Sequence, residues 1–241
     1  MVISMVENFK ITAFELKRQL KISIYLPKNY NIEDKKYPVI YFLDAQVIFA
    51  SVDDKDKEID LPSILNNSGL ECICVGIHAP KNEEWKISEL VPYFKRNESK
   101  IDPSLSFIFI NYLINNLHSL LGQRYRFNDD VFIFGFNEGA ILALYSVGHY
   151  KFFKGGAVFS PRLDLCDGYL RDINDNFTQS SPIYLFFGGK NTENSNSFYN
   201  LFTALEERIN DKVKLIYEEN LENNLSSWKQ YILDAIKYLL P

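Results

Sequence analysis

The strongest constraint on the fold is a series of short apolar segments that, in the later part of the chain, are separated by amphipathic helices. Eight segments have the length and residue types of strands: 9–14, 20–26, 37–43, 72–77, 131–134, 156–159, 183–187 and 213–217. Apolar residues recur at helical spacing in 105–121, 140–147, 198–205 and 228–239. Continuous apolar strands that alternate with helices are typical of a mostly parallel sheet covered on both faces. The sequence therefore predicts an α/β fold, a three-layer sandwich of about eight strands whose first strands are antiparallel.

The length and composition of the chain fit one domain. Its 241 residues are 46% hydrophobic and 24% charged, which supplies enough apolar material for a large core. Neither an internal repeat nor a linker divides the sequence, so residues 1–241 are expected to form a single domain. Polar composition predicts surface loops at 51–60 and 171–181.

The charge balance and the cysteines limit the partners that we expect. A formal net charge of -5 argues against attraction to nucleic acid or to an anionic membrane. Residues 1–16 lack an apolar stretch of the length that a signal peptide or membrane helix needs, which predicts a cytoplasmic protein. Cys72, Cys74 and Cys166 lack the further ligands of a metal-binding pattern. We therefore expect buried free thiols, no metal and no cofactor.

One segment carries a chemical signature. Residues 131–143 are predicted to form a strand, a tight turn and a helix, with Gly135 and Gly139 on either side of Asn137. This is the context of the Gly-x-Ser-x-Gly nucleophile elbow, in which the glycines let strand and helix approach while a strained central residue projects above the sheet. Asn tolerates positive φ, so the turn can survive with Asn137 at its centre. The amide nitrogen of Asn137 is no nucleophile, however, because its lone pair is delocalised into the carbonyl.

Further segments match a known family in their order and spacing. They are 21–27 with Tyr30, 37–46, 75–77, 89–92, 125–126, Phe153, 159–161 and Trp228. Together with the elbow, they make the chain resemble the esterase D and enterochelin-esterase-like branch of the α/β-hydrolases over nearly its full length. The resemblance implies a serine nucleophile at the elbow, an acid after the strand that ends near Phe187, and a histidine shortly before Trp228.

All three of these positions depart from the family pattern. The departures are Asn137 for the serine, Asn191, Thr192 or Glu193 for the acid, and Asn224 in the pair 223–224 for the histidine. An asparagine has no group that titrates near neutrality and cannot replace a histidine as a base. The only histidines of the chain are His78, His118 and His149, and none of them lies in the last third, where the order Ser-Asp-His requires one.

The ends of the predicted strands supply the candidate pocket residues. These candidates are Asp44, Ala45, Gln46, His78, Asn137, Glu138 and Glu193. The resemblance implies that the loop 44–46 and the backbone N–H of Glu138 would form an oxyanion hole. A carboxylate on Glu138 opposes the stabilisation of an oxyanion beside it, which argues against ester hydrolysis. His78 follows a strand at the carboxyl edge of the sheet, where ligands bind in such folds.

These observations favour a catalytically degenerate α/β-hydrolase, that is, a pseudo-esterase. We expect it to bind a small molecule in the former active-site pocket or to interact with other proteins, for example as a homo-oligomer. The alternative is an active hydrolase with a non-standard constellation, in which His78 acts as base for a water aligned by Asn137 and Asn191. A third hypothesis is a structural subunit whose pocket has filled in.

Overall fold

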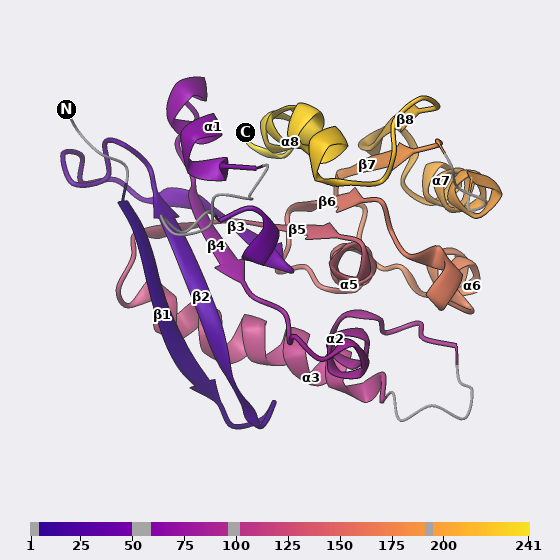
Figure 1. Ribbon diagram of the computed structural model, residues 1–241, viewed down its shortest axis with the longest axis horizontal. Helices are drawn as coiled ribbons and strands as arrows, with labels where there is room; N and C mark the ends of the chain where they lie inside the picture. Colours follow the sequence, from indigo (N-terminus) through magenta and orange to yellow (C-terminus); the bar gives the residue numbers. More distant parts are fainter. Residues whose placement is uncertain (1–4, 50–58, 96–101, 191–194) are drawn as a thin grey trace.

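The central sheet of the molecule has eight strands (Figure 1). The computed structural model describes residues 5–49, 59–95, 102–190 and 195–241. The strands are β1 (Met5–Ala13), β2 (Arg18–Leu26), β3 (Tyr37–Leu43), β4 (Ile73–Ile77), β5 (Phe127–Phe136), β6 (Gly155–Phe159), β7 (Ile183–Gly188) and β8 (Val213–Glu218). Their order in the sheet is β1-β2-β4-β3-β5-β6-β7-β8.

The direction of the strands follows the prediction. β1 and β2 form an antiparallel hairpin, and β2 is also antiparallel to β4. All later pairs, from β4 with β3 to β7 with β8, are parallel. Every residue of β4, β6 and β7 is buried, as expected for continuous apolar strands that are covered on both faces. The predicted mostly parallel sheet with an antiparallel start is therefore confirmed.

Helices cover both faces of this sheet. They are α1 (Leu61–Ser68), α2 (Glu83–Leu90), α3 (Ser104–Tyr112), α4 (His118–Gly122), α5 (Glu138–His149), α6 (Tyr169–Asn176), α7 (Ser195–Ile209) and α8 (Leu225–Leu239). One apolar cluster packs α1 and α8 on one face, and a larger cluster packs α3, α5, α6 and α7 on the other (Figure 1). A π-helical turn, Leu113–Leu117, joins α3 to α4, so 104–122 is one helical stretch, as its apolar spacing predicts.

One loop prediction is wrong and another is untested. The segment 171–181 does not begin as a loop, because α6 extends to Asn176. The polar residues of this segment hid a narrow apolar side of α6, on which Tyr169 and Ile173 are buried. The loop predicted at 51–60 falls almost entirely on residues 50–58, outside the described part of the chain.

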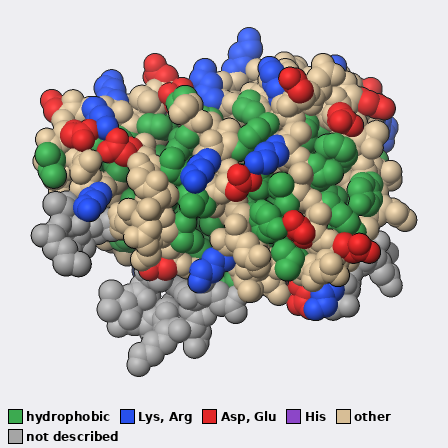
Figure 2. Space-filling model, turned by 90° about the horizontal axis from the view of Figure 1, so that it is seen from above, with side chains coloured by type: hydrophobic (Ala, Val, Ile, Leu, Met, Phe, Trp, Pro, Cys, Tyr) green, Lys and Arg blue, Asp and Glu red, His purple; other side chains and the backbone are tan. Residues whose placement is uncertain are grey.

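The surface over α1 and α8 mixes charges of both signs with apolar side chains (Figure 2). A mixed surface lacks the one-sided field that draws a protein to a phosphate backbone. Within the described residues, no helix combines the length and the apolar character that a membrane crossing requires.

Candidate active site

The elbow forms where β5 meets α5. Asn137 has φ 48° and ψ -114°, which L residues rarely adopt, and its successor begins α5. A Cβ atom on Gly135 would lie 2.1 Å from the carbonyl oxygen of Gly139, so strand and helix pass too closely for a side chain there. The N–H of Asn137 donates to the carbonyl oxygen of Phe159 on neighbouring β6 at 3.0 Å. The predicted elbow is confirmed, with Asn137 half-buried at its centre.

Replacing Asn137 by glycine is expected to raise the free energy of unfolding by about 1 kcal/mol. Glycine relieves about 1–3 kcal/mol of backbone strain and costs about 0.5–1 kcal/mol of chain entropy. Among the described residues, no hydrogen bond holds the Asn137 amide, so little else is lost. Asn137→Ala is the matched control, because it removes the amide and keeps the strain. Urea denaturation measures the free energy of unfolding of both variants. A glycine variant less stable than the alanine variant would contradict the view that the backbone at Asn137 is strained.

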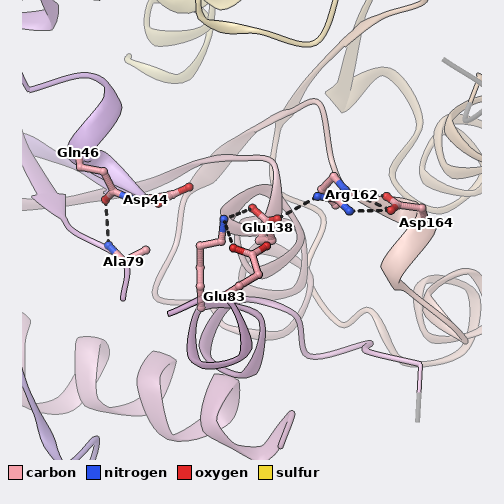
Figure 3. A network of polar contacts seen from close by, with 8 residues as sticks. Asp44, Gln46, Ala79, Glu83, Glu138, Arg162 and Asp164 are labelled. Carbon is pink, nitrogen blue, oxygen red and sulfur yellow. Dashed lines mark hydrogen bonds and ion pairs between the residues drawn. The ribbon is translucent and has the colours of Figure 1, made fainter. Parts of the chain in front are cut away.

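The loop after β3 lies beside the elbow. Leu43 pairs with Gly135 in the parallel sheet, so Asp44 and Asn137 follow neighbouring strands at the same edge. Asp44 has φ 60° and precedes a turn that buries Ala45. The Gln46 amide donates from Nε2 to Asp44 Oδ1 and accepts from the Ala79 N–H at 3.0 Å (Figure 3). Gln46 thereby ties the loop after β3 to the loop after β4.

Asp44 carries a buried carboxyl group. The residue is 7% exposed, and burial raises its pKa from the ordinary 3.8 to about 6, although the Lys86 ammonium acts in the opposite direction. Glu138 nearby adds to the upward shift. A carboxyl with this pKa changes its charge within the range in which cells work.

Glu138, the first residue of α5, is 2% exposed and lies between two cations (Figure 3). Lys86 Nζ of α2 lies 3.1 Å from Glu138 Oε2, and Arg162, which follows β6, places a guanidinium nitrogen 3.2 Å from Oε1. The same cations also pair with Glu83 and Asp164. We expected the Glu138 carboxylate to oppose an oxyanion beside it. In the structure two cations, each shared with another acid, offset part of this charge.

The two asparagines before α8 have different roles. Asn224 is exposed and caps α8 by accepting a hydrogen bond from the Ser227 N–H at 3.1 Å. The Asn223 amide instead turns toward the sheet, where it accepts from Ser160 Oγ at 2.6 Å and from the Gly188 N–H at 2.8 Å and donates to the Gly188 carbonyl at 2.7 Å. We predicted Asn224, of the pair 223–224, at the position of the family histidine. In the structure the side chain of Asn223 is the one that turns inward, because the helix start holds the Asn224 side chain.

The three histidines each bind a partner away from the elbow. His78 Nε2 lies 2.8 Å from Ser23 Oγ on β2. His118 Nδ1 lies 3.0 Å from the hydroxyl of Tyr41. His149 Nε2 lies 2.8 Å from Asp172 Oδ2. His78 follows β4 at the predicted edge of the sheet, but its imidazole is turned toward β2.

The predicted acid position is not described. Asn191, Thr192 and Glu193 all fall within 191–194, outside the described residues. In the described chain, no group of three or more His, Cys, Asp or Glu side chains is placed to hold a metal ion. Arg162 was missed by the sequence analysis, although its position just after β6 at the carboxyl edge of a parallel sheet is the signal that could have found it.

The sheet order and the elbow define an α/β-hydrolase fold. The family model described as "Putative esterase" matches residues 13–231, so the chain belongs to this esterase family. A search of curated protein sequences found no match.

Solved structures with similar folds include a serine hydrolase, the BES protein and an esterase. An IroE-like serine hydrolase from Shewanella oneidensis has a TM-score of 0.77 at 16% identity, over 97% of this chain and 79% of that one. The BES protein from Bacillus cereus has a TM-score of 0.75 at 18% identity, over 98% of this chain and 96% of that one. The enterobactin esterase FES from Shigella flexneri has a TM-score of 0.76 at 15% identity, over 97% of this chain and 58% of that one. Because the sequence identities are this low, these similarities show a shared fold alone.

Proposed function

We propose that this protein binds a small molecule at the carboxyl edge of its sheet without hydrolysing it, as a catalytically degenerate member of the esterase family. The observation that carries the proposal is the elbow: its backbone keeps the strained conformation of a nucleophile elbow, and its central residue is Asn137. An amide side chain cannot form the covalent acyl intermediate on which a serine esterase depends. The fold thus presents a side chain suited to hydrogen bonding where the family mechanism needs an alkoxide.

The histidines support the same conclusion. His118 packs against Phe127, the first residue of β5, at the opposite end of the strand from the elbow. His149 ends the 12-residue helix α5 that begins at the elbow, about 16 Å away along its axis. The alternative of an active hydrolase needs His78 beside Asn137. Because β3 lies between β4 and β5, their ends are about 10 Å apart, and the His78 imidazole is bonded to Ser23.

An esterase assay tests the proposal. With the purified protein, p-nitrophenyl acetate and butyrate are expected to hydrolyse no faster than in buffer without protein. The Asn137→Ala variant is expected to give the same uncatalysed rate. Loss of a whole catalytic triad elsewhere costs about a millionfold in turnover, so an active enzyme would be unmistakable. Turnover by the wild-type protein that disappears in Asn137→Ala or in His78→Ala would overturn the proposal.

The proposal includes a cytoplasmic location. Cys72, Cys74 and Cys166 are buried free thiols, and the Cys72 and Cys74 sulfurs lie 3.8 Å apart. Free thiols are in keeping with the reducing conditions of the cytoplasm.

A further inference from the structure

Within the described part of the chain, one oxygen of the Asp44 carboxylate has no partner. Oδ1 accepts from Gln46, whereas no hydrogen bond or ion pair reaches Oδ2 from the described residues. The residue is 7% exposed, so water replaces the missing partner only in part. Figure 3 shows this carboxyl group pointing from the end of β3 toward the ion pairs of Glu138. An oxygen of a buried residue's carboxylate that points toward a site and has no protein partner there is a place for a donor from a ligand.

The charges around this oxygen are unbalanced. Four carboxylates, those of Asp44, Glu83, Glu138 and Asp164, lie near three cations: Lys86, Arg162 and Lys95, the last of which acts on Asp164. Lys86 is 3.3 Å from Glu83 and 3.1 Å from Glu138, so its nearest charges are already matched. Burial alone would lower the pKa of Lys86, but the three carboxylates near it raise that pKa above its usual value. The cluster therefore carries an excess of one negative charge when all its groups are ionised.

We propose that the site takes a ligand with a positively charged nitrogen group, an amidinium, guanidinium or ammonium, whose N–H donates to Asp44 Oδ2. This assignment rests on the proposed function, because it names the class of ligand for the same binding site. An added cation supplies the missing partner and reduces the excess negative charge at once, whereas a carboxylate or phosphate ligand would add to that excess. Asn137 follows β5, the neighbour of the strand β3 that ends before Asp44. Its amide can therefore hydrogen bond with a neutral part of the same ligand.

Three probes of one shape and different charge test the ligand class. Benzamidine, benzamide and benzoate share a planar ring and a planar head group, with charges of plus one, zero and minus one. Titration calorimetry near neutral pH is expected to show benzamidine binding at least about tenfold more tightly than benzamide, with benzoate weakest. Asp44→Asn, which preserves shape and removes charge, should abolish the preference for benzamidine.

Asp175→Asn serves as the matched control, since it removes an exposed carboxylate on α6. This control should keep the preference for benzamidine. The proposal is overturned if benzamide or benzoate binds as well as benzamidine, if none of the probes binds, or if Asp44→Asn retains the preference. An esterase assay on the same preparation separates the two proposals: turnover overturns the binding function, whereas a missing charge preference overturns the ligand class alone.

Discussion

Replacement of Asn223 by alanine is expected to lower the free energy of unfolding by about 3 kcal/mol. The Asn223 side chain makes three hydrogen bonds, one with Ser160 and two with the backbone of Gly188. Each contributes about 1 kcal/mol net, and the buried partners left behind add a cost of their own. Urea denaturation followed by circular dichroism measures the change.

Asn224→Ala is the matched control for this prediction. The substitution is the same chemical change one residue further along the chain. It removes a helix cap, worth about 1 kcal/mol, and an exposed hydrogen bond to Glu222. Equal losses in the two variants would contradict the assignment of Asn223 to the inward position. A larger loss in Asn224→Ala would reverse the assignment.

The geometry of Asn223 explains why the loss should be large. Its amide presents a donor and an acceptor to the C=O and N–H of one residue, as a neighbouring strand would do at the end of β7. The loop that carries Asn223 lies so close to this strand that a Cβ atom on Gly188 would be 2.5 Å from the carbonyl oxygen of Leu221. The Trp228 indole N–H also donates to Ser160 Oγ at 2.9 Å, so the amide belongs to a network that joins the ends of β6 and β7 to α8.

The strands and the elbow could be predicted because their signals are local. An apolar run such as 183–187 must be buried wherever it lies, and Gly135 with Gly139 permits a close crossing that few other residues allow. The choice between Asn223 and Asn224 could not be made from composition. It depends on the residue at which α8 begins, and only the capping bond to Ser227 decides that.

The ion pairs of the site were beyond sequence reasoning for another reason. Glu138 meets Lys86 and Arg162 from two other elements, across separations that no spacing rule connects. The charge of Glu138 could be read from the sequence, but its compensation arises only in the packed fold. The open oxygen of Asp44 is likewise a result of tertiary structure, because Gln46 satisfies one side of the carboxyl and leaves the other.

Asp44→Asn is expected to stabilise the protein by up to about 3 kcal/mol above neutral pH. Burial raises the pKa of Asp44 from the ordinary 3.8 to about 6, and a pKa difference of one corresponds to about 1.4 kcal/mol. A raised pKa means that the folded state holds its proton more tightly than the unfolded state. Between about pH 4 and pH 6 the unfolded chain therefore ionises first, and the stability due to this group falls as the pH rises.

The pH dependence of the difference between wild type and variant makes the prediction specific. The advantage of Asp44→Asn should be smallest at about pH 4, grow toward about pH 6 and then stay constant, as measured by urea denaturation across that range. Asp164→Asn should behave oppositely, since a hydrogen bond from Arg162 lowers the pKa of Asp164 and its carboxylate stabilises the fold at neutral pH. An Asp44 variant that is less stable at neutral pH, or an advantage independent of pH, would contradict the prediction.

A stabilising Asp44→Asn would connect the stability of the fold to its ligand. In the free protein the ionised carboxylate is a net cost, because burial removes its water and Lys86 is shared with two other acids. A bound cation removes that cost only when Asp44 is present, so benzamidine should raise the unfolding temperature of the wild type and leave Asp44→Asn nearly unchanged. Because the folded protein with a bound cation favours ionised Asp44, this stabilisation should weaken as the pH falls through about 6.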